Sequence, residues 1–227
     1  MNRAAGPENV DEVARPGARV LPFRERTLSG ADDPEIVRML QTGDARGPRL
    51  AWQRLAPMVH RILKRAFGPA YDIGDLVQDV FLTFFDRVAT LREPKALPAF
   101  VMSITAHTIR RELRRKAALR WLQLGETPTT PRAREADLDS REAVARLYAI
   151  LDRLRAGDRT AFVLHFLEGL SLVEVAGALD VSVATAKRLL ARARTRVVSH
   201  AQRDPALVEY VASIEASPCE GDPEGTP

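Results

Sequence analysis

Apolar residues recur at helical spacing along most of this chain. The clearest stripe follows Asp72, where seven apolar side chains fall on one face of a single helix: Ile73, Leu76, Val77, Val80, Phe81, Phe84 and Val88. Weaker stripes of the same period predict further helices near residues 33–43, 55–67, 98–121, 144–154 and 162–167. No segment alternates apolar and polar residues as a strand does, so the pattern predicts an all-α fold.

Segments rich in proline, glycine and mixed charge divide these helices into two small modules. We expect a disordered tail over residues 1–30, a first helical module over 31–121 and a second over 141–202. Residues 122–140 have the composition of a flexible linker, and residues 203–227 form an acidic tail. Two binding modules on one tether could span two separated sites.

Residues 168–196 predict a helix-turn-helix. Ser171 with Glu174 three residues later forms a capping box, and Ser182 is placed to cap a second helix after a turn at Asp180. Five apolar residues of the second helix are expected to face inward: Val183, Ala186, Leu189, Leu190 and Ala193. The remaining surface carries basic side chains and no acidic ones, which suits contact with DNA phosphates and nucleotide base edges better than contact with water alone. A solvated face on an ordinary helical hairpin would normally mix both signs of charge.

Composition agrees with a nucleic-acid partner. Of 227 residues, 45% are hydrophobic and 28% charged, which allows a packed core. The formal charge is +4, with bases concentrated over residues 110–120 and 187–203 and only acids after Arg203. The single cysteine, Cys219, cannot form an intramolecular disulfide, so a reducing cytoplasm is expected. No apolar run is long enough for membrane insertion and no secretory signal is present.

Two segments carry a resemblance to a known family. DIGDLVQDVFLTFF resembles the second conserved region of bacterial RNA polymerase sigma factors, and LEGLSLVEVAGALDVSVATAKRLLARAR resembles the fourth. With these two regions and a short linker, residues 33–200 resemble the extracytoplasmic-function group. The resemblance implies binding to core RNA polymerase, recognition of two promoter elements and assistance in strand opening. It also implies an anti-sigma factor as a further partner that covers both modules.

In such proteins the helix of the second conserved region docks on a coiled-coil clamp of the largest polymerase subunit. The resemblance therefore assigns polymerase contact, or its support, to Asp75, Leu76, Gln78, Asp79 and Phe81. The simpler interpretation of the aspartates is that they favour the positive end of the helix dipole. The two roles are compatible.

The helix from Pro98 to Arg115 resembles the part of a sigma factor that holds the melted minus-ten element. The residues implied are Phe100, His107, Arg110, Arg111, Arg114, Arg115 and Lys116. Basic side chains would follow the backbone of the single strand, while His107 would help to hold a flipped base. The family usually has tryptophan near Phe100, asparagine at His107 and aspartate at Arg111, so the resemblance does not predict the promoter preference of this chain.

The second module resembles the part that reads the minus-thirty-five element. By match to the motif, the candidates are Ser182, Thr185, Lys187, Arg188 and Arg192. The family often has glycine where the turn here has Asp180, and aspartate tolerates positive φ better than most residues. The turn is therefore expected to survive.

Other functions lack support in the sequence. There is no phosphate-binding loop, dinucleotide-binding turn or nucleophile elbow, and the four histidines have no metal-ligand spacing. We expect no catalysis, no cofactor, no metal and no small-molecule substrate. Two alternatives stay open: a helix-turn-helix regulator that binds duplex DNA without polymerase, and an adaptor whose basic helices hold acidic proteins. An acidic tail folded onto a basic helix is a further possibility, although a solvated tail is the simpler expectation.

Overall fold

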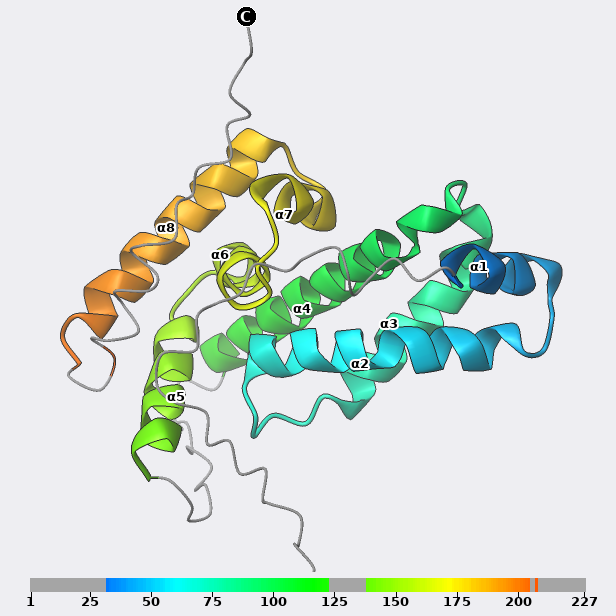
Figure 1. Ribbon diagram of the computed structural model, residues 1–227. Helices are drawn as coiled ribbons and strands as arrows, with labels where there is room; N and C mark the ends of the chain where they lie inside the picture. Colours follow the sequence, from blue (N-terminus) through cyan, green and yellow to red (C-terminus); the bar gives the residue numbers. More distant parts are fainter. Residues whose placement is uncertain (1–31, 123–137, 205–206, 208–227) are drawn as a thin grey trace, which may run out of the picture.

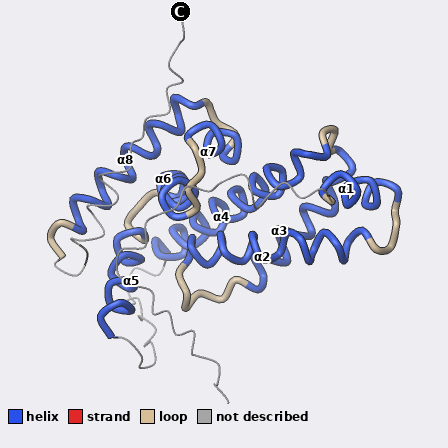
Figure 2. The backbone as a smooth tube through the Cα atoms, in the orientation of Figure 1, coloured by secondary structure: helices blue, strands red, loops and turns tan. Residues whose placement is uncertain are grey.

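The computed structural model of this chain describes residues 32–122, 138–204 and 207, and its regular elements in these ranges are all helical (Figure 1, Figure 2). The all-α expectation is confirmed for this part of the chain. The α-helices are α1 Asp33–Thr42, α2 Gly47–Phe67, α3 Gly74–Arg87, α4 Leu97–Leu122, α5 Leu138–Leu151, α6 Ala156–Phe162, α7 Leu172–Leu179 and α8 Val183–Ala201. Short 3-10 turns lie at Val88–Thr90 and Pro94–Ala96, and a π-helical turn lies at Val163–Leu167. None of the described helices is long and apolar enough to cross a membrane.

The apolar stripe of α3 organises the first module. All seven stripe residues are buried, and α2, α3 and α4 pack against one another. The fully buried Phe84 ring lies 5.1 Å from the Phe85 ring and 6.3 Å from the Phe100 ring, between centroids. This aromatic cluster holds α3 against α4, so the helix with the predicted polymerase residues and the helix with the predicted minus-ten residues form one unit.

Aspartates lie at the starts of two helices. Asp32 occupies the N-cap position of α1. Ile73 occupies that of α3, and Asp72 Oδ1 accepts a hydrogen bond from the backbone nitrogen of Gly74 at 2.9 Å. That bond closes a turn just before the helix. Aspartate therefore supports the start of α3, but from one residue farther out.

In the second module α6 packs along α8, with α5 and α7 beside them. Phe162, Leu164 and Leu190 are fully buried between these helices. The corner between α7 and α8 is formed by Asp180 at φ 53° and ψ 54°, the left-handed region. Among the described residues it is the one non-glycine with positive φ. The prediction that aspartate can form this turn is confirmed.

The two modules are in contact. α4 packs against α2 and α3 on one side and against α6 and α7 on the other, and the π-helical turn reaches α2 (Figure 1). Buried residues of both modules belong to one hydrophobic cluster. Residues 123–137 of the expected linker, and the expected N-terminal tail, lie outside the described residues. The sequence did not predict this contact between the modules, because the contact joins helices that lie far apart in the sequence.

Candidate polymerase and nucleic-acid interfaces

The helix-turn-helix is held by the caps that its sequence predicts. Ser171 Oγ accepts a hydrogen bond from the backbone nitrogen of Glu174 at 3.2 Å, and the Glu174 carboxylate accepts one from the backbone nitrogen of Ser171 at 2.7 Å. Ser182 Oγ accepts from the backbone nitrogen of Thr185 at 3.2 Å. These bonds satisfy amide groups that the first turn of a helix leaves without partners. The caps therefore fix where α7 and α8 begin.

Replacing Ser182 by alanine is expected to lower the free energy of unfolding by about 1 kcal/mol, because the first turn of α8 loses its side-chain acceptor. Ser182→Asp is the matched control, since a carboxylate restores the acceptor and also favours the positive end of the helix dipole. Urea denaturation followed by circular dichroism measures both. Equal midpoints for the alanine variant and the unchanged chain would show that the cap does not stabilise the helix.

The outer face of α8 carries most of the predicted minus-thirty-five residues. Ser182, Lys187 and Arg188 are exposed, and Arg188 donates a hydrogen bond to Thr185 Oγ1 at 3.1 Å. The prediction that Val183 faces inward is wrong: its side chain is 44% exposed. Val183 lies in the first turn of α8, where the neighbouring elements, rather than the helical periodicity, decide which side chains are covered. The exposed start of α8 thus presents the apolar side chain of Val183 beside the capping serine and two basic side chains.

Arg192 differs from its neighbours because it has an internal partner. Its Nη2 and Nε donate to Asp158 Oδ1 at 2.8 and 3.3 Å, and the Asp158 side chain is almost fully buried in α6. The hydrogen bond that Arg192 donates to Asp158 raises the pKa of the Arg192 guanidinium. This pair ties α8 to α6, so Arg192 helps to position α8.

Four of the seven predicted minus-ten residues form an exposed polar face on α4: His107, Arg111, Arg114 and Arg115. Arg111 donates to Asp79 Oδ2 on α3 at 2.6 Å, which joins a predicted DNA residue to a predicted polymerase residue. Arg115 donates to the buried Glu112 at 2.6 Å. Phe100 is half-buried and packs toward Phe84.

Glu112 also orders side chains around the middle of α4. Its Oε1 accepts a hydrogen bond from the Tyr71 hydroxyl at 2.6 Å. The hydrogen bond from Arg115 lowers the pKa of Glu112, while burial, together with Glu112, raises the pKa of Tyr71 to about 12. Glu112 is thus held as a carboxylate, and it fixes the direction of the Arg115 side chain.

The other two predicted minus-ten bases are directed into the protein. Arg110 is half-buried and its Nη1 donates to the backbone oxygen of Leu179, in the second module, at 2.9 Å. Lys116 Nζ lies 4.4 Å from the centroid of the Tyr71 ring, a cation–π distance. Burial lowers the pKa of both side chains. The charge pattern of the sequence alone did not distinguish these two inward-directed residues from the four exposed residues of the same helix.

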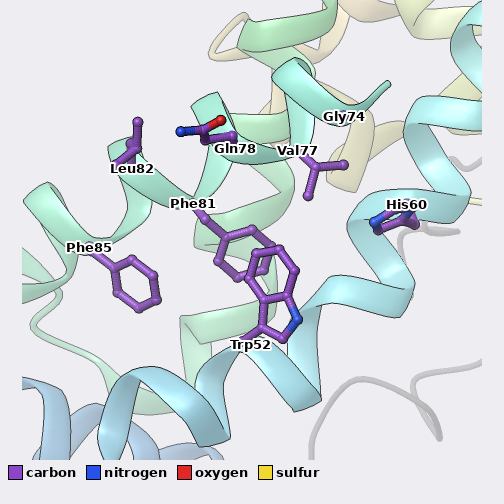
Figure 3. A pocket seen from close by; sticks show the side chains of 8 residues that line it. All are labelled: Trp52, His60, Gly74, Val77, Gln78, Phe81, Leu82 and Phe85. Carbon is purple, nitrogen blue, oxygen red and sulfur yellow. The ribbon is translucent and has the colours of Figure 1, made fainter. Parts of the chain in front are cut away.

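A groove of about 420 Å³ runs between α2 and α3 (Figure 3). It is lined by Trp52, His60, Gly74, Val77, Gln78, Phe81, Leu82 and Phe85. The Trp52 ring packs on the buried Phe81 ring at 4.3 Å between centroids. Trp52 is nevertheless 44% exposed and Leu82 60% exposed, which is unusual for large apolar side chains. Neither Trp52 nor Leu82 is among the site residues predicted from the sequence.

Of the predicted polymerase residues, Gln78 and Phe81 line this groove, whereas Asp75, Leu76 and Asp79 do not. Asp75 and Gln78 are exposed and Asp79 is half-exposed, whereas Leu76 and Phe81 are buried. An exposed apolar residue on the polar side of a strongly amphipathic helix, such as Leu82, was the available signal for the groove. In the described part of the chain, no three metal-ligating side chains gather.

The described part of the chain combines a capped helix-turn-helix, a basic face on its second helix and a further helical module with an apolar groove, an arrangement typical of helix-turn-helix DNA-binding proteins. Comparison with known families agrees. Residues 51–119 match the family model "Sigma-70 region 2", and residues 145–197 match "Sigma-70, region 4". The chain belongs to the extracytoplasmic-function sigma factors of bacterial RNA polymerase.

The chain is similar to two sigma factors of known name over most of their length. The ferric citrate uptake sigma factor FecI of Escherichia coli is 34% identical over 137 residues, which are 58% of this chain and 77% of that protein. The ECF RNA polymerase sigma factor SigE of Mycolicibacterium smegmatis is 30% identical over 176 residues, covering 74% and 68% respectively. A solved structure of CnrH, in complex with the cytosolic domain of CnrY, superposes with a TM-score of 0.56 over 76% of this chain and 99% of that one. At 22% identity it supports the fold alone.

As a sigma factor, the chain directs transcription initiation, with core RNA polymerase and promoter DNA as partners. Sigma factors are non-enzymatic, and the chemistry of RNA synthesis belongs to the polymerase. The two alternatives, a polymerase-independent regulator and an adaptor, receive no support from these comparisons.

Proposed function

We propose that three surfaces of this chain divide the work of promoter recognition. The α2–α3 groove docks on core polymerase, the exposed face of α4 holds the melted minus-ten strand, and α8 reads the minus-thirty-five duplex. One observation carries the proposal: the helix α3 presents an apolar groove with a polar rim on a module that also bears the basic helix α4.

The groove has the composition of a protein-binding site. Stable protein interfaces combine an apolar centre with a polar rim, and aromatic residues are enriched in them. Trp52 and Leu82 supply the exposed apolar surface, and Gln78 is the exposed polar residue of α3 that lines the groove. The buried Phe81 ring lines the groove beneath Trp52, and exposed Asp75 extends the polar surface of α3 beside it.

The face of α4 suits a single strand. Arg111 and Arg114 can follow phosphates, and exposed His107 can contact a base by hydrogen bonding or stacking. Binding energy of this kind stabilises separated strands, because a duplex cannot make the same contacts until its bases are unstacked. This is how a protein without catalytic groups assists opening. Its place of action is then the bacterial cytoplasm, where core polymerase works.

Titration of the purified full chain into fluorescently labelled core polymerase tests the docking surface. Asp75→Arg and Gln78→Ala are expected to weaken binding by on the order of tenfold each, since each removes or opposes a polar contact of an exposed α3 side chain. Glu35→Arg is the matched control, because Glu35 is an exposed carboxylate on α1, away from the groove. Binding that none of the variants changes would place the polymerase contact elsewhere on the chain.

A protein inhibitor fits the same arrangement. CnrH was solved with the cytosolic domain of CnrY, and a comparable partner of this chain would cover the groove and compete with core polymerase. The same titration, repeated with a candidate inhibitor, detects that competition as a loss of polymerase binding.

A further inference from the structure

A buried carboxylate on α6 holds one arginine of α8. Asp158 lies in the first turn of α6, which packs along α8 (Figure 1). Its side chain is almost fully buried, and its Oδ1 accepts hydrogen bonds from Arg192 Nη2 at 2.8 Å and from Arg192 Nε at 3.3 Å. Asp158 Oδ2 is buried and has no hydrogen-bond partner in the described residues. Because a buried charge is costly unless it is paired, this carboxylate keeps the Arg192 guanidinium in place.

The contact uses only one edge of the Arg192 guanidinium. Arginine has five N–H donors in a planar fork, carried by Nε, Nη1 and Nη2. Asp158 takes the hydrogen of Nε and one hydrogen of Nη2, whereas Nη1 donates to no residue in the described part of the chain. One hydrogen on each of Nη1 and Nη2 therefore stays available at the end of the fork. Two parallel donors of this kind pair with O6 and N7 of guanine in the major groove.

Arg192 shares a face of α8 with two other predicted minus-thirty-five residues. Thr185, Arg188 and Arg192 are spaced by three and then four residues, which places them in one row along the helix. The Arg192 side chain is 49% exposed even though its guanidinium is bound to Asp158. Arg188 and Arg192 lie about 6 Å apart along the helix axis, the rise of roughly two base pairs. The two arginines can therefore contact different base pairs.

The negative charge of Asp158 favours orientation of Arg192 over general attraction to DNA. A carboxylate beside Arg192 lowers the positive potential that attracts phosphates to α8, so it disfavours sequence-independent binding. The same carboxylate restricts the rotamers of a long side chain before any base is bound, which lowers the entropy cost of a base contact. An acid in this place therefore weakens binding to every sequence and strengthens the preference for one.

We propose that Asp158 is a specificity-determining residue of the minus-thirty-five interface, because it positions Arg192 so that the free end of the guanidinium reads a guanine. The proposal rests on the role assigned above to α8, and it adds a positioning residue on α6 and a base that α8 selects. Asp158 supports Arg192 from behind, as a second layer of side chains supports the group that contacts a ligand. The simpler role is that Asp158 favours the positive end of the α6 dipole, which would affect folding but not the choice of base.

7-Deazaguanine tests the contact directly, because this base pairs normally with cytosine but lacks the N7 acceptor. A duplex is first selected from a randomised library by the full chain in complex with core polymerase. Each guanine of its minus-thirty-five segment is then replaced in turn, and the dissociation constant is measured. For the unchanged chain, replacement at one guanine is expected to weaken binding about fivefold, since half of a bidentate contact is lost.

Asp158→Ala is expected to reduce that loss to less than about twofold, while affinity for an unrelated duplex is unchanged or higher because a negative charge has been removed. The double variant Asp158→Ala with Arg192→Ala leaves neither charge of the pair without its partner, and it is expected to be insensitive to the replacement. Asp44→Ala is the matched control, because it removes the carboxylate from another aspartate–arginine pair, with Arg46, and is expected to keep the fivefold loss. Circular dichroism confirms that each compared variant is folded.

The outcomes separate this proposal from the role of α8. Selection of no sequence would show that α8 does not read a minus-thirty-five element. A selected sequence in which no guanine is sensitive, or a sensitivity that persists in the double variant, would show that Arg192 reads no guanine. A fivefold loss that persists in Asp158→Ala alone would show that Asp158 does not position Arg192. Equal decreases in affinity for selected and unrelated duplexes in Asp158→Ala would show that Asp158 supports folding alone.

Discussion

Replacing Phe84 by alanine is expected to lower the free energy of unfolding by about 3–5 kcal/mol, because the ring is fully buried and a cavity would remain in its place. The loss falls where α3 meets α4, since Phe84 packs against both Phe85 and Phe100. A domain of this kind has only about 5–15 kcal/mol of stability in total. The substitution would therefore remove a large fraction of the total stability and loosen the α2–α3 groove and the exposed face of α4 together.

Leu82→Ala is the matched comparison on the same helix. Leu82 is 60% exposed, so its truncation is expected to change stability by less than about 0.5 kcal/mol while weakening polymerase binding. Urea unfolding by circular dichroism gives the stabilities, and the fluorescence of Trp52, which packs on Phe81, follows the groove itself. Should Phe84→Ala unfold at the same urea concentration as the unchanged chain, the aromatic cluster does not hold the module together.

Replacing Arg188 by alanine is expected to weaken binding to a minus-thirty-five duplex by about 1–3 kcal/mol if its guanidinium contacts a base edge, and to relax preference at a single base pair. A phosphate contact gives a different result: affinity falls for all sequences alike, and the slope of log affinity against log salt becomes shallower by about one. Arg188 is exposed near the start of α8, where recognition helices touch DNA, so we expect the first of these results.

Fluorescence anisotropy with wild-type and single-base-changed duplexes at several salt concentrations distinguishes a base-edge contact from a phosphate contact. Arg203→Ala is the control, because Arg203 is an exposed base beyond the C-terminal end of α8. Arg192→Ala should behave differently again, lowering stability as well as affinity, since Arg192 pairs with buried Asp158. Unchanged affinity and salt dependence for Arg188→Ala would remove this residue from the interface.

Local chemistry made the helix-turn-helix predictable. The caps at Ser171 and Ser182 and the left-handed Asp180 depend on residues within three or four positions, so their consequences can be derived from the sequence. The stripe of α3 was predictable for the same reason. Val183 was misplaced because a residue in the first turn of a helix is covered or exposed by the neighbouring elements rather than by the periodicity.

Contacts between distant segments were not predictable in this way. Arg159 and Ala66 are 93 positions apart, and nothing in the local pattern of either identifies its partner. The same limit affected Arg110 and Lys116, which belong to a basic run but are directed toward Leu179 and Tyr71. A run of bases predicts a basic surface, but only the packing of neighbouring helices decides which members of the run stay in solvent.

The contact between the two modules also sets an order of events during synthesis of the chain. Glu168, whose carboxylate accepts a hydrogen bond from Arg65, is made 103 residues after Arg65, a delay of roughly 5–20 s at ribosomal rates. During that interval α2 and α3 can already pack, whereas Glu168 has not yet been synthesised. The groove between α2 and α3, which is lined only by residues 52–85, can therefore form on the ribosome before the second module packs against α2.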